Sequence, residues 1–235
     1  MQIPIAMQRN TTELVKKRFE SLAGVYEKAL EKSKYFGVAH MARVFSRHID
    51  DGSQHNQFDV LDLGCGTGLC GKNFKPFARR LDGVDLSPRM LDIARNLGIY
   101  DQLYSGDVIA YFAQAHPNTY DIATSAGLFV YLNELQVVFN SCFSILRPGG
   151  LFVFTIDRHD GIIADVLPSP RSDLMFTYGQ AYVERCLHSA GFRLIALEKI
   201  DDRLDWQNQE PVPAFVVLAM RPGGVRQRDT PTEPA

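Results

Sequence analysis

Short apolar runs alternate with amphipathic stretches along the middle of the chain, and this alternation constrains the fold more than any other feature. The expected strands are Phe58–Leu63, Arg80–Asp85, Leu103–Gly106, Asp121–Ser125 and Leu151–Ile156. The expected helices between them are Leu69–Arg80, Pro88–Leu97, Val108–Ala115 and Asn133–Leu146. Because strands that are apolar throughout and alternate with helices form a parallel sheet covered on both faces, we expect a doubly wound α/β fold.

The C-terminal part of the expected core departs from this alternation. A helix over Gln180–Ala190 ends at Gly191, and two strands, Phe192–Ile200 and Ala214–Met220, follow without a helix between them. Parallel strands need a crossover of about a dozen residues or more, which usually contains a helix. We therefore expect the last two strands to be antiparallel.

Helical spacing of apolar residues also precedes the alternating region, between residues 11 and 49. The polar segment Asp51–Gln57 separates the two parts, and the tail Pro222–Ala235 is rich in Pro, Gly, Arg and Thr. We expect three parts: a helical region over residues 1–50, a core over residues 51–221 and a disordered tail over residues 222–235.

The composition narrows the choice of partners. A chain of 235 residues with 46% apolar and 22% charged residues suits one sizeable α/β domain, and a net charge of −2 without basic clusters disfavours nucleic acid. No apolar run approaches the roughly 20 residues that span a bilayer, and the first residues lack a signal peptide, so we expect a cytoplasmic protein without membrane contact. The spacing of cysteine, histidine and carboxylate residues predicts reduced, buried thiols and no metal site.

The loop after the first expected strand, GCGTGLCGKN (Gly64–Asn73), fits three kinds of ligand site. Gly66–Gly71 has the G-x-G-x-x-G pattern of dinucleotide sites, and Gly66–Lys72 has the G-x-x-x-x-G-K of a Walker loop. Read from Asp62, the same letters give D-x-G-x-G-x-G. A Walker loop places a Ser or Thr hydroxyl on magnesium, which Asn73 cannot supply, so a nucleoside triphosphate is disfavoured.

The charge of Asp62 separates the other two ligands. A carboxylate at the end of the first strand would repel a pyrophosphate by about 1 kcal/mol or more at ~4 Å. It would suit a ligand without phosphate and with a cationic amino-acid end, such as S-adenosylmethionine. Asp85 and Asp107 end the next two expected strands, at the edge where such sheets bind ligands. Asp85 alone would equally bind the ribose of NAD.

Four short elements then resemble the class I S-adenosylmethionine-dependent methyltransferases, over roughly Phe58–Met220. They are, in order, VLDLGCGTG (Val60–Gly68), GVDLS (Gly83–Ser87), SGDV (Ser105–Val108) and LRPGG (Leu146–Gly150). The segment Arg18–Gly37 resembles the helical lid of many small-molecule methyltransferases. It is most similar to a bacterial group of predicted methyltransferases sometimes fused to tetratricopeptide repeats.

This resemblance implies a Rossmann-like sheet of seven strands, mostly parallel, with an N-terminal lid, S-adenosylmethionine as cofactor and methyl transfer to a small-molecule acceptor by in-line displacement. Asp85 would bind both ribose hydroxyls, and Asp107 the adenine amino group. Tyr26 would close over the methionine end of the cofactor, or serve as a core tyrosine. The full set of expected cofactor contacts is Tyr26, Asp62, Gly64, Cys65, Gly66, Gly68, Asp85, Leu86, Met90, Asp107, Val108 and Ala126.

The acceptor side is less defined by the sequence. Positioning alone supplies much of the rate in such a displacement, so no catalytic residue is obligatory; Asp157 and His159, after the fifth strand, are the candidates for acceptor contact or proton removal. The insert Gly161–Tyr178 is expected to shape the acceptor pocket. Two alternatives stay open: an NAD-linked dehydrogenase that uses Gly66, Gly68 and Gly71, and a module that binds S-adenosylmethionine without catalysis. The oligomeric state is not predicted.

Overall fold

The computed structural model describes residues 5–49, 56–161, 165–205 and 208–223, with side chains from residue 12 onward. The expected disordered tail lies outside these residues beyond Gly223, and so does most of the expected boundary segment, residues 51–55. No helix within the described ranges is long and apolar enough to cross a membrane.

Within these ranges seven strands form one sheet in the order β3-β2-β1-β4-β5-β9-β8. They are β1 (Phe58–Leu63), β2 (Ala78–Asp85), β3 (Gln102–Ser105), β4 (Tyr120–Ser125), β5 (Leu146–Asp157), β8 (Arg193–Leu204) and β9 (Pro211–Met220). The first five pair in parallel, whereas β9 is antiparallel to both β5 and β8. The doubly wound, mostly parallel seven-stranded sheet and the antiparallel final pair are therefore confirmed.

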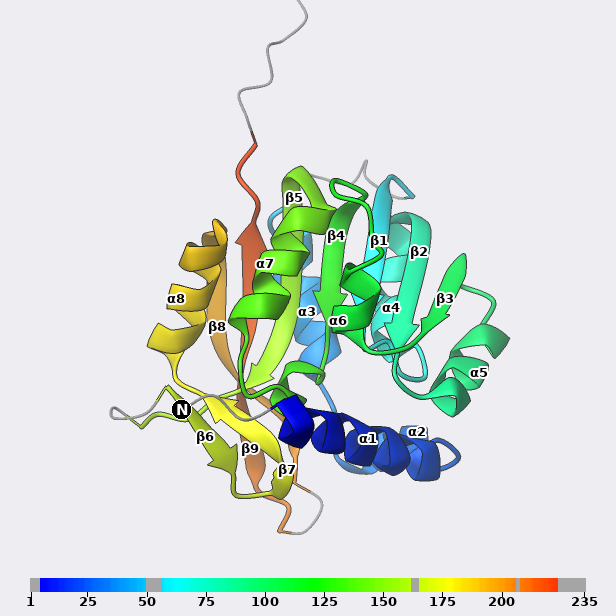
Figure 1. Ribbon diagram of the computed structural model, residues 1–235, viewed down its shortest axis with the longest axis vertical. Coiled ribbons are helices and arrows are strands. Elements are labelled where there is room, and N and C mark those ends of the chain that lie inside the picture. Colours follow the sequence, from blue (N-terminus) through cyan, green and yellow to red (C-terminus); the bar gives the residue numbers. More distant parts are fainter. Residues whose placement is uncertain (1–4, 50–55, 162–164, 206–207, 224–235) are drawn as a thin grey trace, which may run out of the picture.

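Helices cover both faces of this sheet (Figure 1). On one face lie α6 (Val108–Phe112), α7 (Gln136–Ile145) and α8 (Gln180–Ala190), and on the other lie α3 (Gly37–Ser46) and α4 (Leu69–Phe74). The first face is packed with aromatic rings, among which Phe139 of α7 stands edge-on to Phe152 of β5 with ring centroids 5.4 Å apart. On the second face Phe45 of α3 packs against Phe74 of α4. The helix α5 (Pro88–Asn96) follows β2 and contacts β2 and β3.

The structure differs from the local predictions at three places. The helix after the glycine loop ends at Phe74 rather than Arg80, because Pro76 lies in the 3-10 turn Lys75–Phe77 and β2 begins at Ala78. The strand β5 begins at Leu146 rather than Leu151, with a register shift where it pairs with β4. The insert before α8 contains the hairpin of β6 (Val166–Ser169) and β7 (Ser172–Tyr178), which the sequence did not predict as strands.

The N-terminal region divides into two parts with different packing. α1 (Ile5–Leu22) and α2 (Tyr26–Lys32) lie across the edge at which the parallel strands end, as Figure 1 shows. In contrast, α3 is part of the core, since its Val38, Met41 and Phe45 are buried against the sheet. Only α1 and α2 therefore have the placement of a lid.

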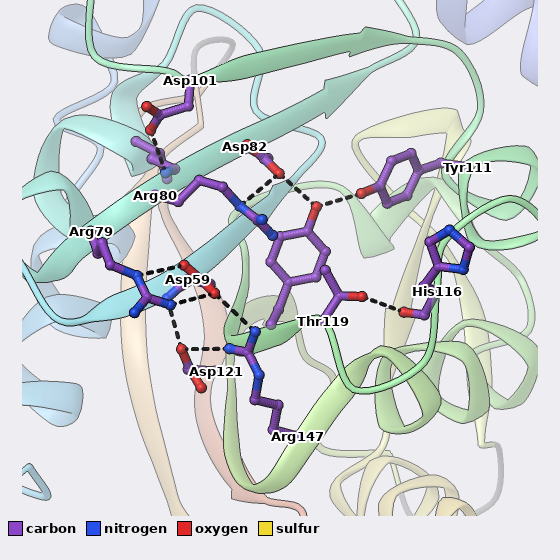
Figure 2. Close-up of polar contacts among 12 residues, drawn as sticks. Asp59, Arg79, Arg80, Asp82, Asp101, Tyr111, His116, Thr119, Asp121 and Arg147 are labelled. Carbon is purple, nitrogen blue, oxygen red and sulfur yellow. Dashed lines mark hydrogen bonds and ion pairs between the residues drawn. The ribbon is translucent and has the colours of Figure 1, made fainter.

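The opposite edge of the sheet is held by an ionic network (Figure 2). Asp59, at the start of β1, accepts hydrogen bonds from Arg79 of β2 (Nη2 to Oδ2, 2.7 Å) and from Arg147 of β5 (2.9 Å). Arg147 also pairs with Asp121 of β4 at 2.8 Å. The network thus joins the starts of the four adjacent strands β2, β1, β4 and β5. The C-terminal ends of these parallel strands lie on the other side of the sheet, where such sheets bind ligands.

Candidate active site

The glycine loop between β1 and α4 is built from left-handed backbone positions. The φ angles of Gly64, Gly66 and Gly68 are +66°, +54° and +94°, a region that residues with a Cβ rarely adopt. Gly64 and Gly66 line a cavity of about 790 Å³. Gly68 does not line it, because a Cβ there would lie 2.6 Å from Cδ1 of Leu97. The first two glycines therefore face ligand space and the third permits packing.

Asp85 lies at the wall of this cavity, at the end of β2. Its Oδ2 accepts a hydrogen bond from the backbone N–H of Gly66 and its Oδ1 accepts one from Ser87, both at 2.8 Å. Burial raises the pKa of this carboxyl, and the two N–H groups oppose that shift. Each carboxylate oxygen keeps further acceptor capacity, so Asp85 is fixed in place and still able to accept hydrogen bonds from two hydroxyl groups.

Asp62 lies behind the loop rather than on the cavity wall. Its side chain is fully buried and accepts hydrogen bonds from the Tyr100 hydroxyl (2.7 Å) and the Thr124 hydroxyl (3.2 Å). Burial raises the pKa of Asp62 from the ordinary 3.8 to about 6, against the effect of these hydrogen bonds. Space for Tyr100 comes from Gly71, where a Cβ would lie 2.1 Å from the tyrosine oxygen. Asp62 therefore supports the loop from beneath.

We expect Asp62→Asn to flatten the pH dependence of stability. The folded-state pKa lies above the unfolded one, so the protonated carboxyl favours folding; this contribution is complete below pH 3.8 and is lost as the pH rises through 6. Titration of Asp62 should lower the free energy of unfolding of the wild type by up to about 3 kcal/mol between pH 4 and pH 7, and the variant should lack this contribution. Urea unfolding of both proteins at several pH values measures the difference, and equal pH slopes would contradict the assignment.

Nine of the twelve expected cofactor contacts line the cavity. They are Tyr26, Gly64, Gly66, Asp85, Leu86, Met90, Asp107, Val108 and Ala126. The other three do not line it: Asp62 lies behind the loop, and Cys65 and Gly68 belong to the loop itself. The buried Cys65 donates its backbone N–H to the Val84 carbonyl at 3.0 Å, and burial raises the pKa of its thiol. Their contact with a cofactor stays a prediction. All four cysteines are buried as free thiols.

An aromatic cluster forms another part of the wall. Phe19 of α1 packs edge-on against Tyr26 of α2 (centroids 5.9 Å apart) and against Tyr131 (5.5 Å), which lies in the 3-10 helix η2 (Phe129–Tyr131) after β4. Burial raises the pKa of both tyrosines, so both phenols stay protonated. The sequence indicated Tyr26 but not Phe19 or Tyr131; the only signal for Tyr131 was its position just after a strand end.

Apart from Phe176, which belongs to the insert expected to shape the acceptor pocket, the rest of the wall was not expected from the sequence. It comes from α1, the loop after β3, α6, the segment between β4 and α7, the start of α7, and β7, and consists of Thr12, Glu13, Val15, Gly106, Ile109, Ala110, Ala113, Gly127, Leu128, Leu132, Asn133, Glu134, Val137 and Phe176. From the insert that was expected to shape the acceptor pocket, Phe176 reaches the cavity.

Asp157 and His159 lie near the strand ends but do not line the cavity. Both carboxylate oxygens of Asp157 accept hydrogen bonds from the guanidinium of Arg203, at 3.0 and 2.8 Å. His159 accepts a hydrogen bond at Nδ1 from the N–H of Gly161 (3.1 Å), and its Nε2 is buried without a partner among the described residues. Neither residue therefore lines the cavity in which an acceptor would bind, and a role for them in acceptor contact or proton removal stays a prediction.

The helix α1 is attached at two points above the cavity. Glu20 accepts hydrogen bonds at Oε1 from the Ser87 hydroxyl (2.6 Å) and the Arg89 N–H (3.2 Å), and the Arg89 side chain donates to the Glu20 carbonyl (2.9 Å). Arg18 donates to the Ser172 hydroxyl of β7 (3.1 Å). Ser87 lies two residues after Asp85, so the attachment of α1 and the expected ribose contact share one loop.

Comparison with known proteins agrees with this geometry. Residues 60–150 match a family model described as a methyltransferase domain. A ubiquinone biosynthesis O-methyltransferase of Sodalis glossinidius is 25% identical over 178 residues, which are 72% of this chain and 66% of that protein. The chain spans about half the length of other curated relatives that it matches.

Solved structures share the fold at low sequence identity. Burkholderia thailandensis 1,6-didemethyltoxoflavin-N1-methyltransferase, solved with its substrate and S-adenosylhomocysteine, has a TM-score of 0.69 and 15% identity, covering 94% of this chain and 93% of that one. The [4+2]-cyclase SpnF has a TM-score of 0.63 and 17% identity, covering 80% and 81%. The resemblance to class I S-adenosylmethionine-dependent methyltransferases is confirmed, and the resemblance to the group with tetratricopeptide repeats stays a prediction.

Proposed function

We propose that the protein binds S-adenosylmethionine in the cavity beneath α1 and transfers its methyl group to a small-molecule acceptor. The observation that carries this proposal is the placement of Asp85, whose carboxylate is held by Gly66 and Ser87 and faces a cavity of about 790 Å³. A fixed carboxylate at the end of the second strand is the group that binds a ribose diol in such sheets. The volume lies within the range of ligand sites in proteins, toward its upper end.

The other residues of the wall fit the remaining parts of this cofactor. Asp107 uses Oδ1 to accept the N–H of Ile109 at the start of α6 (2.7 Å), which leaves its second oxygen for an adenine amino group. Leu86, Met90 and Val108 line the same part of the cavity and suit the faces of a flat base. No Lys or Arg is found among the described lining residues, so the site offers a diphosphate no cationic side chain.

The bound cofactor would supply a methyl group activated by a positively charged sulfur. The chain's own task is then to orient the acceptor and exclude water, and such positioning supplies about 7–11 kcal/mol when reacting atoms are held ~3–3.5 Å apart. Tyr26, Tyr131 and Phe19 present aromatic rings to the cavity, and such rings attract cations. Since both phenols stay protonated, they would serve as hydrogen-bond donors rather than as bases.

Two alternatives make different predictions. A dehydrogenase would bind NADH, but Gly68 and Gly71 face Tyr100 rather than the cavity. A binding module would bind S-adenosylmethionine without turnover, and because a cyclase shares this fold, the fold alone does not fix the reaction. Thermal unfolding with S-adenosylhomocysteine and with NADH distinguishes the proposed methyltransferase from a dehydrogenase. Stabilisation by NADH alone would refute the proposal. Release of S-adenosylhomocysteine in an acceptor screen separates the second.

We also propose that α1 and α2 act as a lid whose attachment slows cofactor release. Glu20→Ala should remove the side-chain bonds to Ser87 and Arg89 and raise the dissociation rate of S-adenosylhomocysteine about threefold to tenfold, because these bonds attach α1 to the loop after β2. Stopped-flow displacement measures this rate. Glu31→Ala, on the exposed surface of α2, is the matched control. Equal rates in both variants and the wild type would contradict the lid.

The remaining expectations extend this proposal. Residues 1–50 would form the lid region, with residues 51–221 as the catalytic core, although α3 packs within that core. The relative from Sodalis glossinidius is an O-methyltransferase, so transfer to oxygen of a small molecule is the first reaction to test. A cytoplasmic location and the absence of nucleic-acid binding stay predictions.

A further inference from the structure

The helix α6 supplies much of the wall at the expected adenine end of the cavity, yet it is short. Val108, Ile109 and Ala110 line the cavity, and Asp107, which also lines it, caps the first turn of the helix. The helix has 5 residues, and isolated helices of fewer than about 12–15 residues are marginal in water. The position of α6 therefore depends on its contacts with the rest of the fold.

A chain of three polar side chains connects α6 to the sheet. The Tyr111 hydroxyl lies 2.6 Å from the Tyr120 hydroxyl at the start of β4, and the Tyr120 hydroxyl donates to Oδ2 of Asp82 in β2 at 2.8 Å. Because Tyr120 gives its single proton to Asp82, Tyr111 is the donor in the first bond. Burial raises the pKa of both phenols, so both keep the protons that they donate. Figure 2 shows Tyr111 and Asp82, which form the two ends of this chain.

The end of this chain in the sheet is firmly held. Asp82 and Tyr120 are each 2% exposed, and they belong to two strands of the same sheet. Oδ2 of Asp82 lies 3.3 Å from Nε of Arg80, whose guanidinium lies over the Tyr120 ring, 5.1 Å from its centroid. A hydrogen bond to a charged acceptor is stronger than one between neutral groups, and it strengthens the next bond of a chain. The sheet therefore offers Tyr111 a fixed and strong acceptor.

Tyr111 also shares one helical turn with Asp107. The Tyr111 N–H donates to the Asp107 carbonyl at 2.9 Å, and Oδ1 of Asp107 accepts the N–H of Ile109 at 2.7 Å. Tyr111 thus joins the sheet by its side chain and Asp107 by its main chain. A phenylalanine would fill the same space without the cost of burying a hydroxyl group. The hydroxyl of Tyr111 therefore serves to fix the position of the helix rather than to fill space.

We propose that Tyr111 is a positioning residue for the adenine end of the cofactor site. Through Tyr120 and Asp82 it fixes α6, and α6 holds the Asp107 carboxylate where it accepts a hydrogen bond from the amino group of the base. The precision of this placement determines how well the site distinguishes bases with and without that amino group. The inference rests on the proposed function, since it places the adenine against Asp107, but Tyr111, Tyr120 and Asp82 do not line the cavity themselves.

The test compares two ligands, S-adenosylhomocysteine and S-inosylhomocysteine, in which a carbonyl group replaces the amino group of the base. Tyr111→Phe removes the hydroxyl and keeps the ring. Tyr104→Phe is the matched control: Tyr104 packs against Tyr111 with ring centroids 5.0 Å apart, but it is 40% exposed and its hydroxyl makes no hydrogen bond to the described residues. Calorimetry on the full chain measures both affinities for the wild type and each variant.

We expect the wild type to bind S-adenosylhomocysteine at least about tenfold more tightly than the inosine analogue, whose carbonyl oxygen would face the Asp107 carboxylate without a donor. Tyr111→Phe should lower this ratio about threefold or more, and Tyr104→Phe should leave it within about 1.5-fold of the wild type. In an Asp107→Asn background, Tyr111→Phe should leave the ratio unchanged, because the carboxylate that it positions is gone.

An unchanged ratio in Tyr111→Phe, even with weaker binding of both ligands, would show a merely structural role and overturn the inference. The same change in Tyr104→Phe, or equal binding of both ligands by the wild type, would overturn it as well. Each of these results leaves S-adenosylhomocysteine bound and the proposed function intact. Failure of the wild type to bind S-adenosylhomocysteine would instead overturn the proposed function, and this inference with it.

Discussion

Asp85→Asn is expected to weaken binding of S-adenosylhomocysteine at least about 100-fold. The carboxylate would accept hydrogen bonds from two ribose hydroxyls, each worth about 1.5–3 kcal/mol when the acceptor is charged, while an amide keeps one neutral acceptor. A loss of about 3 kcal/mol corresponds to about two orders of magnitude in Kd. Isothermal titration calorimetry measures the change.

The control for this substitution is Asp92→Asn. Asp92 lies on α5, near the same loop, but its exposed carboxylate pairs with Arg95 and does not line the cavity. Thermal unfolding of both variants reports whether the loop still folds around Gly66 and Ser87. A folded Asp85→Asn protein with wild-type affinity would show that the ribose is bound elsewhere.

Gly37→Ala is expected to have the largest effect on stability. A Cβ at Gly37 would lie 1.8 Å from Oδ1 of Asp202 and 3.2 Å from Cγ2 of Thr155. Asp202 is buried and cannot move freely, because its carboxylate pairs with Arg203 and its carbonyl accepts the N–H of Phe36 (2.8 Å). Overpacking of this kind costs about 1–3 kcal/mol or more, which is about 2–12 °C in Tm for a chain of this size.

Gly24→Ala provides the matched comparison for Gly37→Ala. A Cβ at Gly24 would have no atom within 4 Å, and its backbone is not left-handed. Its free energy of unfolding should stay within about 1 kcal/mol of the wild type, or rise, because alanine restricts the unfolded chain. Urea unfolding of both variants decides the matter: equal stability of the two would contradict the tight contact between α3 and Asp202.

The sequence predicted features that are written in local patterns. Alternating apolar runs indicated the parallel sheet. Because Asp85 and Asp107 lie at the expected strand ends, the sequence placed both at the ligand-binding side of the sheet, and both line the cavity. Glycine spacing located the loop, and the helix expected from Pro88 begins at that residue, with Ser87 as its N-cap. These features depend on neighbours within a few residues, which is what periodicity and turn preferences report.

The rest depends on contacts between distant segments. The buried Asp62 has a hydrogen-bond partner in Tyr100, which lies 38 residues later in the chain. Similarly, Asp157 contacts Arg203 only because β8 belongs to the same sheet as β5. The hairpin of β6 and β7 forms by strand pairing that the apolar pattern of the sequence does not indicate. α3 looks like the preceding helices in sequence, yet it packs in the core. No local pattern encodes these partners, so their roles followed only from the structure.

The most direct test of the central claim is a crystal structure of the protein with S-adenosylhomocysteine. We expect the ligand in the cavity beneath α1, with both ribose hydroxyls within hydrogen-bonding distance of Asp85 and the adenine between Met90 and Val108. A ribose bound away from Asp85, or density for a dinucleotide in that cavity when both ligands are offered, would contradict it.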